Sequence, residues 1–234
     1  MKNKQAIIAV GVIFGVLLID QLSKLWIKTT MVLGEEIDVL PWFKIHFVEN
    51  EGMAFGLELG GGYGKLLLSS FRLIASALII VLLNRLIRSR TTHTGFIICI
   101  SLILAGALGN IIDSIFYGIL FSDSYSKVAT FLPADGGYAS LLHGKVVDML
   151  YFPLFEGFLP RWIPFFGGQY FLFFRAVFNV ADSAISIGVF LILLFQRSFF
   201  PAEKTETTPV VAESNIETNP IVTLDTDASL SKEG

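Results

Sequence analysis

The sequence predicts a mainly α-helical membrane protein with four transmembrane helices, a small extracytoplasmic β-platform and an outer amphipathic loop segment. Apolar residues make up 53% of the 234 residues, which is more than a soluble domain of this size needs. These residues are concentrated in long blocks, and blocks of roughly 20 apolar residues are typical of helices that cross a membrane.

Four blocks reach that length, at about residues 6–27, 66–87, 95–120 and 176–196. The first block follows two lysines, as in a signal peptide, but no small-x-small cleavage site comes after it. We therefore interpret it as an uncleaved span. The four spans predict one membrane domain over residues 1–200.

The positions of Lys and Arg predict the orientation of these spans, because both residues are enriched in cytoplasmic loops. They lie before span one, between spans two and three, and after span four, as Lys2, Lys4, Arg85, Arg88, Arg90, Arg197 and Lys204. With four spans, these places lie on one side, so both termini are expected in the cytoplasm. The links at 28–65 and 121–175 are then outside.

The two outer links and the C-terminal residues differ in composition. Residues 42–48 alternate and are rich in aromatic and β-branched residues, which predicts a strand of the platform. The link at 121–175 is rich in Phe and interrupted by Pro, which predicts an interfacial segment on the outer leaflet. Residues 201–234 are rich in Thr, Glu, Asp and Ser, which predicts a disordered cytoplasmic tail.

Charge and cysteine content exclude several classes of protein. The formal net charge is −3 and no stretch is strongly basic, so no nucleic-acid partner is expected. Cys99 is the only cysteine, which excludes an internal disulfide and a cysteine-rich metal cluster. The three histidines are scattered without a metal-ligand spacing, and we predict no metal and no cofactor.

Three carboxylates lie inside predicted spans, where an ionisable side chain costs on the order of a few kcal/mol. Asp20 lies late in the first span, Asp113 in the second half of the third, and Asp182 early in the fourth. The predicted orientation of the spans places all three in the outer half of the bilayer.

Amides and glycines accompany these carboxylates. An asparagine stands three residues before the acid on the third span (Asn110) and on the fourth (Asn179), a spacing at which two residues share a helix face. Gly106 and Gly109 on the third span predict the close approach of another helix.

Asp148 lies in the outer link, directly after two valines, and is expected near the same level. Two carboxylates that meet in a low dielectric cannot both ionise easily, so the pair can divide general-acid and general-base work on a water. Such acids also serve as helix–helix contacts, with Arg72 as a candidate counter-charge. From the residues alone, hydrolysis, ion-coupled transport and a membrane scaffold stay open, although transporters usually have more spans.

Five blocks of the sequence resemble the lipoprotein signal peptidase (signal peptidase II) family of aspartic peptidases. In chain order they are DQLSK at 20–24, NEGMAFG at 50–56, GALGNIID at 106–113, VVD at 146–148 and FNVADS at 178–183. Their order and their placement relative to the four spans also match. The resemblance covers about residues 5–197.

The resemblance implies that Asp148 and Asp182 form the catalytic pair. By the same mapping, the supporting and substrate-binding residues are Asp20, Lys24, Asn50, Gly52, Asn110, Asp113 and Asn179. The implied reaction needs no metal and no cofactor.

The implied substrate is a diacylglyceryl-modified prolipoprotein, which is cut just before the lipidated cysteine. Membrane lipids and globomycin-type inhibitors are the other implied partners, the inhibitor in the same cleft, and a monomer is the simplest expectation. The implied location is the bacterial cytoplasmic (inner) membrane, with the active site toward the outer leaflet.

The sequence departs from the family pattern in two places. Ser114 stands where most members have Arg, and we consider Arg72 and Arg175 as replacements. The interval before Asp148 contains extra residues at about 121–145. Since these residues lie outside the motif blocks, we expect altered substrate gating with the chemistry intact.

Overall fold

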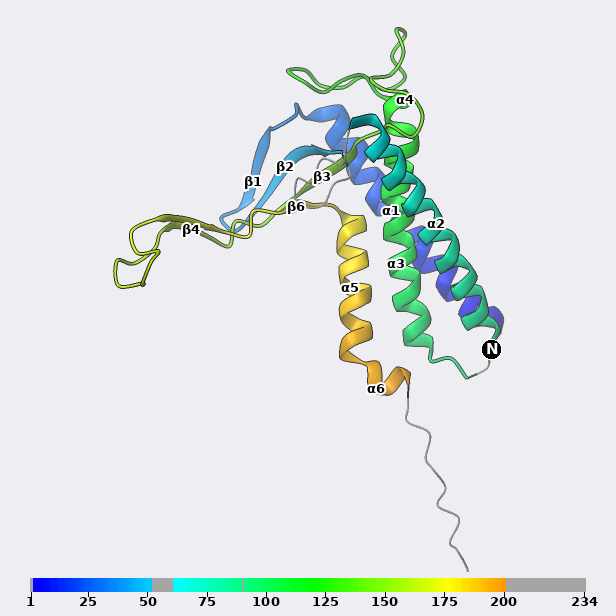
Figure 1. Ribbon diagram of the computed structural model, residues 1–234. Helices are drawn as coiled ribbons and strands as arrows, with labels where there is room; N and C mark the ends of the chain where they lie inside the picture. The colour runs from blue at the N-terminus through cyan, green and yellow to red at the C-terminus, as the bar shows by residue number, and fades with distance from the viewer. Residues whose placement is uncertain (1, 52–60, 90, 201–234) are drawn as a thin grey trace, which may run out of the picture. The chain divides into compact units, whose positions relative to one another are not determined.

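The computed structural model describes residues 2–51, 61–89 and 91–200, in which long helices join a small antiparallel sheet (Figure 1). The helices are α1 (Lys2–Thr30), α2 (Gly61–Arg88), α3 (Thr94–Ile112), η1 (Asp113–Tyr117), α4 (Gly118–Leu120), α5 (Val180–Leu194) and α6 (Gln196–Phe199). The strands are β1 (Glu36–Leu40), β2 (Phe43–Asn50), β3 (Val146–Tyr151), β4 (Phe155–Phe158), β5 (Tyr170–Phe173) and β6 (Val177–Phe178). The tail predicted to be disordered lies outside the described residues.

Three helical stretches of the described chain are long and apolar enough to cross a membrane, namely Asn3–Thr30, Gly64–Arg88 and Thr94–Leu120. They confirm long apolar helices at the positions of the first three predicted spans. Large apolar side chains such as Phe14 on α1 and Leu78 on α2 are exposed. Exposure of this kind is expected where lipid takes the place of water.

Helix α5 is shorter than the span predicted at 176–196. It has 15 residues and a length of about 22 Å, against a hydrocarbon core of about 30 Å. It begins at Val180 because Val177–Phe178 join the sheet as β6 and Asn179 caps the helix. The predicted start at 176 is therefore wrong, and the fourth span stays a prediction.

Helix α5 packs directly on α3. A Cβ added at Gly106 would lie 2.2 Å from the backbone oxygen of Ala181, and one at Gly109 would lie 2.6 Å from Oδ2 of Asp20. Only glycine leaves room for such contacts. The predicted close approach at these two glycines is confirmed, and it brings α5 and α1 against α3.

The main sheet has the order β1-β2-β3-β6, with every pair antiparallel. The strand predicted at 42–48 is confirmed as part of β2. The outer link at 121–175 was predicted as an amphipathic loop segment, but it contributes β3 and the β4–β5 hairpin. For these strands the prediction is wrong: β3 pairs with the distant strand β2, and β4 and β5 pair with each other, which satisfies their backbone groups. An interfacial position for the link stays a prediction.

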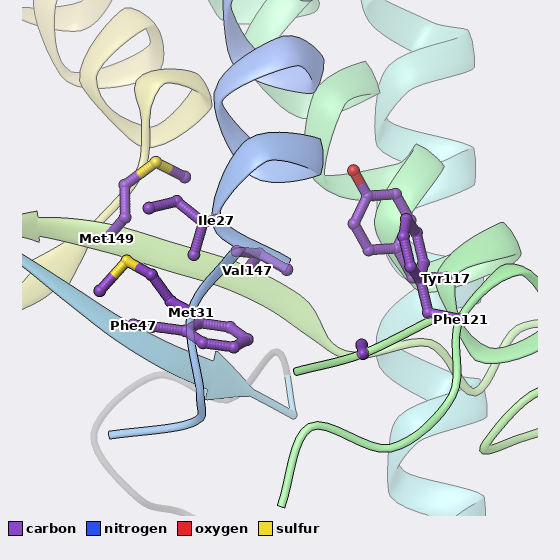
Figure 2. Packing of buried hydrophobic residues seen from close by; sticks show 8 residues of the cluster. Ile27, Met31, Phe47, Tyr117, Phe121, Val147 and Met149 are labelled. Carbon is purple, nitrogen blue, oxygen red and sulfur yellow. The ribbon is translucent and has the colours of Figure 1, made fainter. Parts of the chain in front are cut away.

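One face of the sheet covers an apolar core at the end of α1 (Figure 2). Phe47 on β2 and Val147 on β3 are fully buried there against Ile27 and Met31 of α1. Because side chains alternate along a strand, Val48 and Asp148, which are paired in register, lie on the opposite face. The sheet therefore separates this core from the side on which Asp148 lies.

Candidate active site

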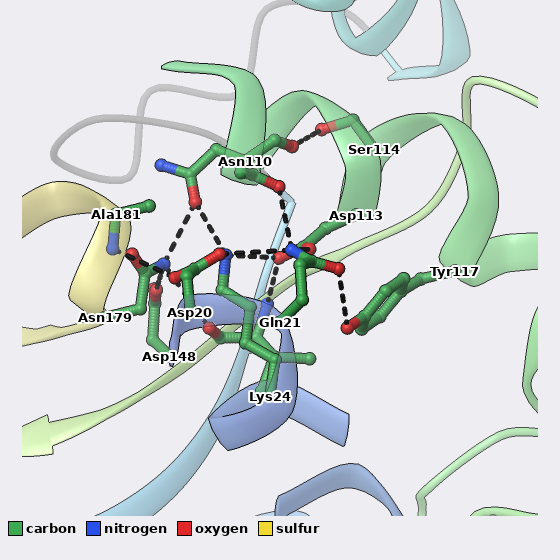
Figure 3. Close-up of polar contacts among 12 residues, drawn as sticks. Asp20, Gln21, Lys24, Asn110, Asp113, Ser114, Tyr117, Asp148, Asn179 and Ala181 are labelled. Atoms are coloured by element: carbon green, nitrogen blue, oxygen red, sulfur yellow. Dashed lines mark hydrogen bonds and ion pairs between the residues drawn. The ribbon is translucent and has the colours of Figure 1, made fainter. Parts of the chain in front are cut away.

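A buried ammonium group lies at the centre of the candidate site (Figure 3). Nζ of Lys24 is 2.8 Å from Oδ2 of Asp20 and 2.8 Å from Oδ2 of Asp113, and all three side chains are fully buried. It also donates a hydrogen bond to Oδ1 of Asn110 at 3.0 Å. Buried charges are tolerated when they are paired and hydrogen-bonded in this way. Lys24 therefore binds α1 to α3.

The other contacts of the two acids connect them to α5 and β3. Oδ1 of Asp20 accepts a hydrogen bond from the backbone N–H of Ala181 at 2.9 Å. Oδ2 of Asp113 accepts one from the N–H of Val147 at 3.3 Å, and Oδ1 accepts one from Gln21 at 3.0 Å. These contacts favour the interpretation in which Asp20 and Asp113 hold the fold together.

Helix α3 changes its winding at the acid. The π-helical turn η1 begins at Asp113, and turns of this kind are frequent at functional sites. Oγ of Ser114 donates to the backbone oxygen of Asn110 at 2.9 Å and accepts from Nη1 of Arg72 at 3.3 Å. Of the two arginines considered for this position, Arg72 approaches Ser114, whereas Arg175 is exposed.

Two asparagine side chains link α3 to α5. Asn179 caps α5 in a capping box, in which its Oδ1 accepts from the N–H of Asp182 at 2.9 Å and its own N–H donates to Oδ2 of Asp182 at 3.4 Å. Nδ2 of Asn179 donates to Oδ1 of Asn110 at 3.1 Å, and Nδ2 of Asn110 donates to Oδ1 of Asp182 at 2.7 Å. The shared helix face predicted for Asn179 and Asp182 is wrong, because Asn179 precedes the first turn.

Asp148 lies on β3 and is buried beside the same asparagine. Nδ2 of Asn179 donates to Oδ1 of Asp148 at 2.7 Å, and Nδ2 of Asn50 on β2 donates to Oδ2 at 3.1 Å. Asn179 therefore contacts the carboxyl groups of both Asp148 and Asp182.

The surroundings of Asp148 favour its protonated form. Burial, together with the charge of Asp182, raises the pKa of Asp148 to about 7, against the opposing effects of Asn50, Asn179 and Lys24. Burial is the largest cause, since an ionised carboxylate loses its hydration there. A carboxyl group with a pKa near neutral pH is suited to proton transfer.

The predicted site residues that the structure describes come together in this cluster, whereas Gly52 lies outside the described residues. Sequence reasoning missed Gln21. Its Nε2 donates to the backbone oxygen of Gly109 at 3.2 Å, and its Oε1 accepts from the hydroxyl of Tyr117 at 3.3 Å. The sequence feature that could have identified Gln21 is a polar side chain within an apolar span, since an amide there needs hydrogen-bond partners.

The apolar helices and the buried acids behind a small sheet define an integral membrane protein with a candidate acid–base site. Two solved structures, each described as a bacterial membrane enzyme obtained by the in meso method, resemble the chain. One, at 1.9 Å resolution, has a TM-score of 0.51 and 26% identity, covering 83% of this chain and 92% of that chain. The other, at 2.3 Å, has the same TM-score and identity, with coverages of 87% and 93%.

Sequence comparison identifies the family. The family described as signal peptidase (SPase) II matches residues 12–198. A lipoprotein signal peptidase of Porphyromonas gingivalis is 54% identical over 190 residues, which are 81% of this chain and 83% of the relative. One of Amoebophilus asiaticus is 40% identical over 214 residues, with coverages of 89% and 86%. The chain belongs to the signal peptidase II family, which confirms the resemblance and makes it a member of a peptidase family.

Proposed function

We propose that the protein is an intramembrane aspartic endopeptidase that removes the signal peptide from diacylglyceryl-modified prolipoproteins, cutting just before the lipidated cysteine. The relatives named above, which are lipoprotein signal peptidases, support the substrate class. One observation carries the catalytic assignment, namely that Asn179 contacts the carboxyl groups of both Asp148 and Asp182.

In the proposed reaction, the two carboxyl groups hold one proton between them. Asp182 is the base and takes a proton from the attacking water, while the protonated Asp148 donates its proton toward the scissile amide. The raised pKa of Asp148 supports its role as the proton carrier. Hydrogen bonds from Asn110 and Asn179 to Asp182 support its role as an acceptor. The reaction needs no metal and no covalent intermediate.

The remaining site residues have supporting roles in this proposal. Asp20, Lys24 and Asp113 hold α1, α3, α5 and β3 together around the pair. Asn50 supports Asp148 from β2. The carboxyl pair lies where helix ends and strands meet, and the half-buried side chain of Asp182 supports access of water while the substrate stays in lipid.

We further propose that α5 is the fourth span, that both termini are cytoplasmic and that the active site faces the outer leaflet of the bacterial inner membrane. A substrate whose signal helix lies in the membrane and whose acyl chains stay in lipid then presents its scissile bond at that level. A globomycin-type inhibitor is expected to compete with the substrate for the site at Asp148 and Asp182. The active enzyme in this proposal is a monomer.

The test is cleavage of a purified diacylated prolipoprotein in detergent, with a chelator present throughout. Wild type is compared with Asp148→Asn and Asp182→Asn, and with Asp135→Asn, an exposed acid in the outer link, as the matched control. Wild type and the control should cut just before the lipidated cysteine, as read by mass spectrometry. Each variant of the pair should be slower by at least about 10³-fold, as for other residues that act as a catalytic unit.

Each outcome has a separate meaning. Undiminished cleavage by Asp148→Asn or Asp182→Asn removes that residue from the pair. Equal rates on lipidated and unlipidated substrate contradict the substrate class. A well-folded wild type that cuts neither substrate overturns the proposed activity.

A further inference from the structure

A second buried ion pair lies apart from Lys24. Lys28, one helical turn further along α1, forms an ion pair with Glu49 on β2, and the two side chains are 1% and 2% exposed. Nζ of Lys28 also donates to Oγ of Ser124 at 2.8 Å. Burying an ion pair costs the hydration of both charges, so a buried pair is a candidate for a specific structural role. The catalytic proposal makes no use of this pair.

Lys28 also contacts the extra residues at about 121–145. Besides Ser124, Tyr138 belongs to this segment, and Nζ of Lys28 lies 4.8 Å from the centroid of its ring, a cation–π distance. The hydroxyl of Tyr138 accepts from the backbone N–H of Lys145 at 2.6 Å, directly before β3 begins. Lys28 is thus in contact with the extra segment and, through Glu49, with strand β2.

Strand geometry connects this ion pair to the carboxyl pair. Glu49 is paired in register with Val147, whose side chain is in the apolar core. The next residue, Asn50, lies on the opposite face of the strand and donates to Asp148. A shift of β2 by one residue would exchange these faces. An anchor at Glu49, next to Asn50 in the strand, would therefore favour the register in which Asn50 reaches Asp148.

We propose that Lys28 and Glu49 are positioning residues for the carboxyl pair, which hold β2 in the register where Asn50 contacts Asp148 and couple this contact to the extra outer residues. The inference rests on the proposed function. It also assigns a role to the extra segment, whose Ser124 and Tyr138 complete the surroundings of the Lys28 ammonium.

The pH dependence of cleavage reports on this contact. The charged groups that act on Asp148 are Asp182 from α5, Lys24 from α1 and Arg72 from α2. The amide of Asn50 lowers the pKa of Asp148. Loss of that hydrogen bond should move the alkaline limb of the kcat/KM profile to higher pH.

Lys28→Met and Glu49→Gln give opposite changes in charge, and this separates positioning from long-range electrostatics. If the two residues act by position, both variants should move the alkaline limb upward, by about half a pH unit. If they act only through their charges, Lys28→Met raises the limb and Glu49→Gln lowers it. Their kcat should fall by about 10-fold, with KM within about twofold, since small misplacements mainly affect the reacting geometry.

Two controls complete the experiment. Lys44→Met removes a lysine from β2, the strand that also contains Glu49. Lys44 forms an exposed ion pair with Asp38 at 3.2 Å, so this variant should leave kcat and the alkaline limb unchanged. Asn50→Ala should reproduce the upward shift. In the Asn50→Ala background, Lys28→Met should add no further shift.

If the alkaline limb moves in opposite directions in Lys28→Met and Glu49→Gln, the positioning role is wrong. It is also wrong if the limb stays in place in both variants and only the yield of folded enzyme falls. Glu49→Gln keeps side-chain volume and hydrogen-bonding capacity, so it decides the question if Lys28→Met fails to fold. A wild type without cleavage overturns the proposed function and this inference with it. An active wild type with unmoved limbs in both variants overturns this inference alone.

Discussion

Replacement of Lys24 by Met removes the single positive charge that pairs with both Asp20 and Asp113 in the buried cluster. The methionine is of similar length and apolar, so the change leaves two carboxylates in the interior without their partner. Breaking a buried ion pair by removing one partner costs about 3–5 kcal/mol of folding free energy. For a chain of this size, that corresponds to a decrease in melting temperature of about 6–20 °C.

Thermal unfolding of the purified protein in one detergent measures this effect. Lys44→Met is the matched control, because its ion pairs with Glu36 and Asp38 are exposed and such pairs contribute about 0–1 kcal/mol. Asp20→Asn provides an internal comparison. It leaves Lys24 paired with Asp113 and keeps an oxygen that can accept from the N–H of Ala181, so its cost should be smaller, about 1–2 kcal/mol.

The order of the three variants tests the reasoning. We expect Lys24→Met to be the least stable, Asp20→Asn intermediate and Lys44→Met close to wild type. A melting temperature for Lys24→Met equal to that of Lys44→Met would refute the account of the site as a cluster held by one ammonium group.

Three further predictions concern the pair, the helix contact and the cap. Because the pKa of Asp148 is raised to about 7 by burial and by Asp182, kcat/KM should fall as pH rises above about 7 and Asp148 loses its proton, and a flat profile to pH 9 would contradict this. Gly106→Val should lower both melting temperature and cleavage, because an added Cβ meets a backbone oxygen at 2.2 Å, whereas Gly11→Ala, with open space around it, should do neither. Asn179→Ser retains a good N-cap, so the free energy of unfolding should change by less than about 1 kcal/mol. Cleavage should fall by about 100-fold, because the amide contacts to Asp148 and Asn110 are lost. A loss of stability large enough to account for the loss of cleavage would point to a capping role alone.

The positions of three membrane helices and of the buried acids could be predicted from the sequence, because both depend on local properties. A long apolar run must satisfy its backbone internally, and a charge within such a run stands out against its neighbours. Gly106 and Gly109 were found for the same reason, since a missing side chain marks where a helix can be approached.

The start of α5 could not be predicted from its own residues. Val177–Phe178 continue the apolar run, but they pair with Leu150 and Tyr151 of β3, which are distant in the sequence. This pairing ends the strand at Phe178 and leaves Asn179 to cap the helix. Hydropathy contains no information about a partner strand, so the boundary was placed too early.

The residues that would carry the chemistry were nameable from the sequence, but their contacts were decided by the tertiary structure. Family resemblance selected Asp148 and Asp182, whereas only the folded chain shows that Asn179 contacts both. Likewise, Lys24 and Lys28 lie one turn apart in the same span, yet one pairs with Asp20 and Asp113 and the other with Glu49. The sequence indicates that Asp20 and Asp113 are charges within apolar runs, whereas the burial of Lys28 and Glu49 is decided by the fold. The packing of helices and strands determines which partner each charge meets, because those partners come from distant parts of the chain.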